Sequence, residues 1–130
     1  MRFIKTQASW LATLLLMLNS GCGGDSPEAH RVDSRRARSV LEEVLASWKQ
    51  GQTPESWRQK SPEVVIQDFD WQGGARLQSF EVLSEEPIDA NLHCRVKLTL
   101  KASEKKMTQR TVTYLVGTSP VLTVFREFGP

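Results

Sequence analysis

The side chains best suited to acid–base chemistry are two aspartates, Asp68 and Asp70, and one histidine, His93. A carboxylate and an imidazole that face one pocket can act as general base and orienting partner. His93, however, belongs to the polar row of an alternating segment and should point away from the core. The aspartates flank Phe69 in a connecting segment, where acids usually cap a helix or contact solvent. We therefore predict that none of the three is catalytic and keep them as the candidates if the protein is an enzyme.

Sequence motifs for metals, phosphates and nucleophiles are missing from the chain. The two histidines and two cysteines lie at no spacing typical of zinc ligands. Gly73 and Gly74 are not followed by the lysine and hydroxyl residue of a phosphate-binding loop, and no Gly-x-Ser-x-Gly segment occurs. The sequence thus predicts neither a cofactor nor a metal site.

The first residues of the chain have the pattern of an export signal. Arg2 and Lys5 precede an apolar run at residues 10–18, and the small residues Ser20 and Gly21 follow it. A helix that crosses a bilayer needs about 20 apolar residues, so this shorter run predicts a removable signal peptide over residues 1–21.

The segment Leu18-Asn19-Ser20-Gly21-Cys22 resembles the lipobox of bacterial lipoproteins, in which a small residue precedes the cysteine that becomes the lipidated N-terminus. The resemblance implies cleavage between Gly21 and Cys22 and a diacylglyceryl group on Cys22. Two or more acyl chains hold a protein stably on a bilayer. Because Gly23 is not an aspartate, the resemblance also implies the periplasmic face of the outer membrane in a cell with two membranes. The alternative is that Cys22 is only a small residue near a conventional cleavage site.

The length and the net charge of the exported part limit its domain number and the kinds of partner it can bind. Without residues 1–21 the chain has 109 residues, enough for a tether at residues 22–33 and a single domain at residues 34–130. Arg2 and Lys5 leave with the signal, so 15 basic and 15 acidic side chains remain. A neutral chain gives no general reason to expect nucleic-acid binding. One basic cluster can be a solvated helix start or can contact anionic lipid headgroups, and it comprises Arg31, Arg35, Arg36 and Arg38.

Apolar residues recur at helical spacing over residues 34–50, where Asp33 or Ser34 can cap the start and Gly51 can end the helix. Two further segments repeat a helix-start signal, a hydroxyl residue followed by proline and an acid, and they are Thr53-Pro54-Glu55 and Ser61-Pro62-Glu63. We predict a short helical turn after each. Beyond the glycine pair, alternating apolar residues predict strands at residues 76–83, 90–102, 107–116 and 121–128. The last of these carries apolar residues on both faces, which predicts an interior strand.

This order of elements resembles the small cone-shaped domains grouped as nuclear transport factor two-like, SnoaL-type or cystatin-like folds. The resemblance implies an α+β domain in which one N-terminal helix and short helical turns pack on a curled, four-stranded antiparallel sheet. Enzymes of this kind often place an aspartate and a histidine in the pocket between helix and sheet.

Large aromatic side chains can line such a pocket or simply fill the core of so small a domain. We favour core filling, and the residues are Trp48, Trp57, Phe69, Trp71 and Tyr114. Cys94 lies in the apolar row of its strand, so we predict that it is a buried small hydrophobe and not a nucleophile.

Taken together, these patterns predict a membrane-anchored bacterial lipoprotein whose small extracytoplasmic domain is a non-enzymatic binding or interaction module. Its partner would be an envelope protein or a small apolar ligand. One alternative is a small cone-fold enzyme of the isomerase, cyclase or hydrolase type that acts on an apolar ligand. Another is a structural subunit that forms a homodimer through an outward row of threonines, which includes Thr99, Thr111 and Thr113.

Overall fold

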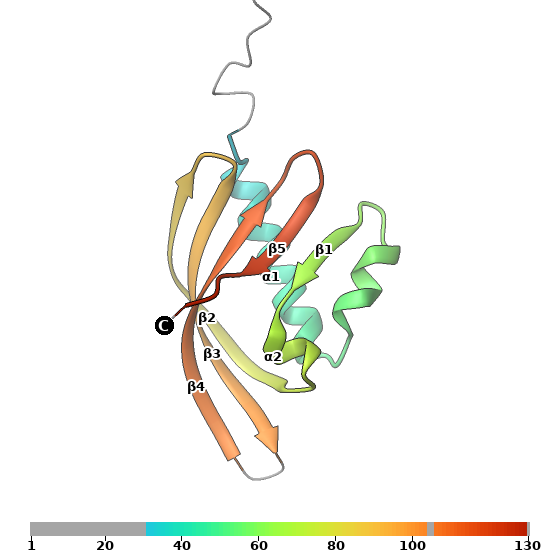
Figure 1. The fold of residues 1–130 in the computed structure, drawn as a ribbon, viewed down its shortest axis with the longest axis vertical. Coiled ribbons are helices and arrows are strands. Elements are labelled where there is room, and N and C mark those ends of the chain that lie inside the picture. The colour runs from blue at the N-terminus through green and yellow to red at the C-terminus, as the bar shows by residue number, and fades with distance from the viewer. Residues whose placement is uncertain (1–30, 104–105, 130) are drawn as a thin grey trace, which may run out of the picture.

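The computed structural model of the chain describes residues 31–103 and 106–129. It is an α+β fold with one long helix and an open, five-stranded mixed sheet (Figure 1). The strands lie in the order β1-β5-β4-β3-β2, and α1 lies behind the sheet in the view of Figure 1. The elements are α1 (Ser34–Lys49), a 3-10 helix η2 (Pro54–Gln59), β1 (Val64–Gln67), α2 (Phe69–Gln72), β2 (Arg76–Ile88), β3 (Asn91–Ser103), β4 (Lys106–Gly117) and β5 (Leu122–Arg126).

Helix α1 forms where the apolar spacing predicts it. The Asp33 side chain caps its first turn by accepting a hydrogen bond of 3.1 Å from the backbone N–H of Arg36. The chain leaves the helix through Gly51, whose φ of 88° lies in the left-handed region that favours glycine. The buried face of the helix consists of Ala37, Val40, Leu41, Val44, Leu45, Ser47 and Trp48.

The sheet differs from the prediction in strand number and direction. The segment Val64-Val65-Ile66, predicted as a helical turn, forms β1, which pairs in parallel with β5. The prediction of a purely antiparallel, four-stranded sheet is therefore wrong. Three consecutive β-branched residues fit a pleated strand better than a helix, and β5 supplies a partner that is not adjacent in sequence. The turn predicted earlier in the chain does form, as η2.

The remaining strands follow the predicted order with some shifts in their ends. β2, β3 and β4 are joined by antiparallel ladders, and β2 extends five residues beyond the predicted residue 83. β5 lies inside the sheet between β1 and β4, as its apolar residues on both faces predict.

The hydrophobic core lies between α1 and the face of the sheet that the helix covers. Cys94 is part of it and is completely buried. Burial raises the pKa of the Cys94 thiol to about 11, and the charge of Glu85 adds to this shift. The buried side chains of the hydrophobic core that come from β3, β4 and β5 are Leu92, Cys94, Val96, Leu98, Leu100, Tyr114, Val116, Leu122 and Val124.

The predicted signal peptide at residues 1–21, the lipidation site Cys22 and the tether up to residue 30 lie outside the described residues. Within residues 31–103 and 106–129, no helix has the length and apolar character needed to cross a bilayer.

Candidate functional site

Asp68 organises the connection between β1 and α2. Its Oδ1 atom accepts hydrogen bonds from the backbone N–H groups of Asp70 (3.0 Å) and Trp71 (3.2 Å), so it is the N-cap of the short helix. This cap fits the expectation that acids in such a connector bond to nearby backbone. The burial of Asp68 was not expected, since its side chain is only 1% exposed and has no contact with bulk solvent to speak of.

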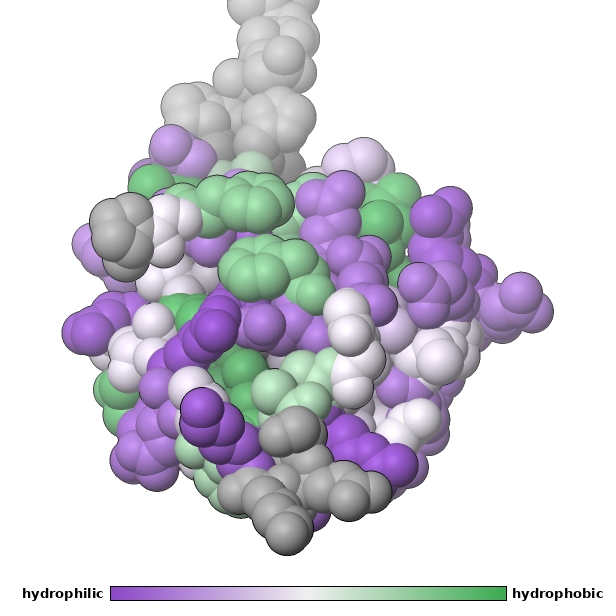
Figure 2. All heavy atoms as spheres, turned by 60° about the horizontal axis from the view of Figure 1, so that its bottom comes forward, coloured by the Kyte–Doolittle hydropathy of each residue, from purple (hydrophilic) through white to green (hydrophobic). Residues whose placement is uncertain are grey.

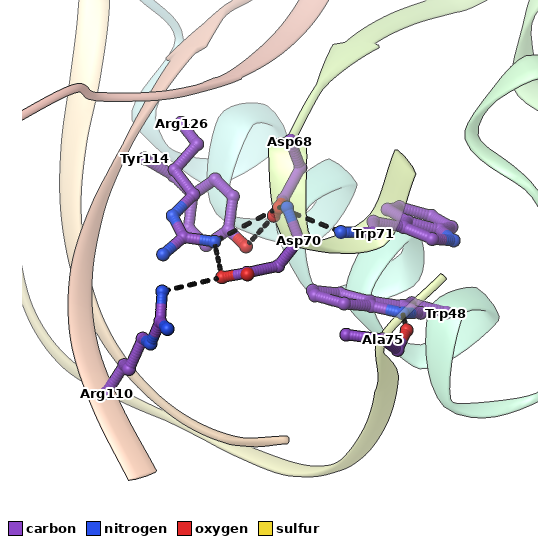
Figure 3. Close-up of polar contacts among 8 residues, drawn as sticks. All are labelled: Trp48, Asp68, Asp70, Trp71, Ala75, Arg110, Tyr114 and Arg126. Carbon is purple, nitrogen blue, oxygen red and sulfur yellow. Dashed lines mark hydrogen bonds and ion pairs between the residues drawn. The ribbon is translucent and has the colours of Figure 1, made fainter. Parts of the chain in front are cut away.

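Two side chains from the sheet reach this buried carboxylate. Tyr114 on β4 donates its hydroxyl hydrogen to Asp68 Oδ2 (Figure 3). Arg126 at the end of β5 donates from Nη1 to Asp68 Oδ1 at 3.2 Å. Asp68 therefore accepts four hydrogen bonds, and its charge is compensated by a guanidinium that is itself 4% exposed.

The cluster continues from Asp68 to the protein surface through Asp70. Arg126 also donates to Asp70 Oδ2, and the exposed Arg110 on β4 reaches the same oxygen at 3.3 Å (Figure 3). Two carboxylates thus face two guanidinium groups, so the cluster carries no net charge. It joins α2, β4 and β5 through side chains that lie 40 to 58 residues apart in sequence.

The environment keeps the Tyr114 hydroxyl protonated and the Arg126 guanidinium charged. Burial raises the pKa of Tyr114 well above its usual value, and the neighbouring negative charge of Asp68 raises it further. Burial alone lowers the pKa of Arg126. The hydrogen bond to Asp70 and the charges of both aspartates outweigh that effect, so its pKa lies above the usual value.

A stack of exposed aromatic rings covers the buried guanidinium. Arg126 lies 4.1 Å from the centroid of the Phe69 ring, and Phe69 stacks on Phe128 with centroids 5.7 Å apart. Phe69 is 44% exposed and Phe128 is 81% exposed. With Asp70 and Arg110 they form what we term the aromatic–arginine patch. Figure 2 shows hydrophobic side chains lying among hydrophilic ones on one face of the molecule.

The tryptophans lie elsewhere and are bonded into the structure. Trp48 and Trp71 stack with centroids 5.1 Å apart, and their indole N–H groups donate to the carbonyls of Ala75 and Gln52 at 2.9 Å each. The two rings border an open groove of about 600 Å³. Trp57 lies apart from them and donates to Ser47 Oγ at 2.8 Å.

The structure thus brings together Asp68, Asp70 and Tyr114 and separates them from His93. His93 lies on the face of the sheet away from α1, opposite Leu115 of β4. Phe69 is exposed, whereas Trp48, Trp57, Trp71 and Tyr114 are buried.

Sequence analysis did not single out Arg126 or Arg110. The available signal was the position of Arg126 directly after the largely apolar segment Leu122–Phe125. An arginine that is buried with such a segment requires a buried anion as its partner. Nothing local in the sequence identifies Asp68 as that anion.

The buried polar groups of the cluster are bonded within the protein. Every buried side-chain nitrogen or oxygen in the described part of the chain has a hydrogen-bond partner. Within that part, no three His, Cys, Asp or Glu side chains converge as metal ligands would. Comparison with models of protein families, with curated proteins and with solved structures found no match.

Proposed function

We propose that this chain is a lipid-anchored bacterial envelope protein whose domain is a non-enzymatic interaction module. In this proposal, the lipobox-like segment directs acylation of Cys22. The aromatic–arginine patch contacts a protein partner at the cell envelope.

The observation that carries the interaction role is the exposure of two large aromatic rings above a rigid, buried support. Aromatic residues, including phenylalanine, and arginine are enriched in protein interfaces relative to the rest of the surface. Phe69 stacks on Phe128 and packs against the buried Arg126, so the Phe69 ring has little side-chain freedom left to lose on binding. A core function does not account for this arrangement, because both rings lie outside the core.

The position of the patch agrees with an anchored molecule. Residue 31 enters the domain beside the turn after β2 and the loop after β4, since Val32 N–H donates to Asp89 O and Asp33 N–H donates to Thr118 Oγ1. β5 begins at that same loop and β1 runs parallel to it. Phe69 and Phe128 follow the far ends of these two strands. The patch therefore lies away from the point where the chain arrives from its anchor.

Two observations weigh against a pocket enzyme. Asp68 accepts hydrogen bonds from Tyr114, from Arg126 and from the backbone N–H of Trp71, which leaves no free polar pair for a substrate. None of three grooves on the surface, with volumes of about 600, 430 and 560 Å³, is lined by Asp68, Asp70 or Tyr114.

A homodimer formed through the sheet is a second candidate, and the uncovered face of the sheet favours it. Leu115 and Phe125 are paired across β4 and β5 on this face, and both are half-buried. The threonines Thr111, Thr113 and Thr123 lie on the same face in the observed register. Such a face can pair with a second copy of itself.

Photo-crosslinking in the native host tests the interaction role. A benzoyl-phenylalanine is placed at Phe128 in one variant, at Phe125 in a second and at the exposed Gln72 beside the tryptophan groove as a control. We expect a discrete crosslinked species from position 128 that disappears when Arg110 is changed to alanine. A species of twice the chain mass from position 125 would favour the homodimer. Crosslinks from position 72 alone would refute the proposed surface.

The anchor is tested separately by the intact mass of the N-terminal peptide from the membrane fraction. We expect a peptide that begins at Cys22 and carries acyl chains, and its absence in a Cys22→Ala variant. An unmodified N-terminus at another residue would refute the lipid anchor and leave the interaction surface to be judged by crosslinking.

A further inference from the structure

The end of the domain where residue 31 enters exposes aliphatic side chains on two neighbouring loops. Ile88 closes β2 and is 41% exposed, and Val121 precedes β5 and is 39% exposed. Each follows an exposed proline, Pro87 and Pro120. Neither aliphatic side chain belongs to the core cluster.

Backbone contacts hold the entering chain against these same loops. Val32 N–H donates to Asp89 O at 3.0 Å, in the turn that follows Ile88. Asp33 N–H donates to Thr118 Oγ1 at 3.2 Å, in the loop that contains Val121. The direction from which the chain arrives is therefore set by the loops that carry the exposed aliphatic groups.

Basic side chains surround this end. Arg31, Arg35 and Arg36 are exposed, whereas Arg38 pairs with Glu42 at 2.6 Å and Glu85 at 2.8 Å. Three acids are also nearby: Asp33, which caps α1, and the exposed Glu86 and Asp89. The charges are mixed, so electrostatic attraction alone does not select a surface, and the aliphatic residues must contribute.

The length of the chain between the lipidation site and the domain limits how far this end of the domain can lie from the membrane. Cys22 and Arg31 are nine residues apart in sequence, a separation that spans at most about 32 Å when fully extended. We propose that the loops carrying Ile88 and Val121, with Arg31, Arg35 and Arg36, rest on the headgroup region of the membrane that holds the lipid anchor. This inference rests on the proposed lipidation of Cys22.

Because the domain is tethered to the membrane, even a weak contact with the headgroups is sufficient to orient it. A short linker turns membrane contact into an intramolecular event at a high effective concentration. Two aliphatic side chains inserted among headgroups, with arginines beside anionic lipids, then hold the domain in one orientation. In that orientation the aromatic–arginine patch faces away from the bilayer.

Depth-dependent quenching of a single fluorophore tests the contact. The full chain is produced in a host that processes lipoproteins, checked by intact mass and reconstituted into vesicles of phosphatidylcholine and phosphatidylglycerol that contain a nitroxide lipid labelled near its headgroup. Single cysteines replace Ile88, Val121 or Met107 and carry the fluorophore. Cys94 is buried with its thiol pKa at about 11, so the introduced thiol is labelled selectively.

The control position, Met107, has a similar exposure of 53% but lies near the start of β4, at the other end of the long hairpin. We expect quenching at positions 88 and 121 to be at least about threefold stronger than at position 107, and to weaken when Arg35 is changed to glutamine. A lipidated chain with equal quenching at all three positions would overturn the contact and leave the anchor intact. A chain without acyl groups would overturn both.

Discussion

The change Arg126→Met should destabilise the domain strongly, because it removes the cation from a buried ion pair. Asp68 is 1% exposed at its side chain and would keep its negative charge with only hydrogen bonds to offset it. Removing one partner of a buried pair typically costs about 3–5 kcal/mol, since the remaining charge is buried without compensation. With a denaturant slope of about 1.5–2 kcal/mol per molar urea for a small domain, the unfolding midpoint should fall by roughly 2 M.

The assay is urea unfolding of the chain from residue 23 onward, followed by tryptophan fluorescence and far-ultraviolet circular dichroism. Arg110→Met is the matched control, because Arg110 bonds to Asp70 but is largely exposed. Its loss should cost less than about 1 kcal/mol, as exposed ion pairs usually do.

A double variant, Arg126→Met with Asp68→Asn, separates the buried charge from lost packing. Asparagine keeps an oxygen for the α2 cap and removes the unpaired charge, so we expect it to recover at least about 1 kcal/mol of the loss. The reasoning fails if Arg126→Met is as mild as Arg110→Met, or if the double variant is no more stable than the single one.

Three further predictions concern single side chains. Tyr114 is the only tyrosine, so tyrosinate absorbance should not rise near pH 10 in the folded protein and should appear only on unfolding. Because the folded pKa of Tyr114 is raised, the free energy of unfolding should be unaffected by this group below pH 10 and should fall above it by up to about 1.4 kcal/mol per pH unit. The variant Tyr114→Phe should remove that fall. A normal titration midpoint in the native state would refute this burial. Cys94 should not react with a thiol reagent at pH 8 until urea unfolds the chain, and prompt labelling would contradict its place in the core. Gly117→Ala should lower the free energy of unfolding by about 1–3 kcal/mol, because an added Cβ would lie 2.7 Å from Thr123 Oγ1. Adding Thr123→Ala should restore part of the thermal midpoint. If the midpoint does not recover, the clash with Thr123 is not the cause of the loss.

The features that sequence analysis predicted well are those that depend on neighbouring residues. Helix α1 follows from apolar spacing, a capping aspartate and a terminal glycine, all within one segment. The strands β3 and β4 follow from period-two alternation, and the interior place of β5 follows from its two apolar faces. The outward position of His93 was likewise expected from alternation alone.

The prediction at β1 failed because a local signal competed with a distant partner. Ser61-Pro62-Glu63 has the residues of a helix start, yet the following β-branched residues pair with β5, so that Val64 lies opposite Leu122. The hydrogen bonds of a parallel ladder come from residues far along the chain, and no pattern within the segment reveals them.

The candidate site shows the same division. The residue types of Asp68, Asp70 and Tyr114 marked them for attention, but only the folded chain places them together with Arg126 and Arg110. A buried arginine requires an anion as partner, because burying its charge alone costs too much free energy. That requirement does not identify which acidic residue pairs with it. The sheet register and the cap of α2 decide the pairing.

By itself, the sequence determined helix α1 with its ends and the alternation of the long strands, and it predicts export and lipidation signals that lie outside the described residues. These depend on local periodicity and on short motifs that are read along the chain. Only the tertiary structure decided that β1 joins the sheet in parallel, that Asp68 and Arg126 compensate each other in the interior and that Phe69 and Phe128 stack outside it. Burial and charge compensation are properties of groups brought together from distant positions, so the folded arrangement has to be known before they can be assigned.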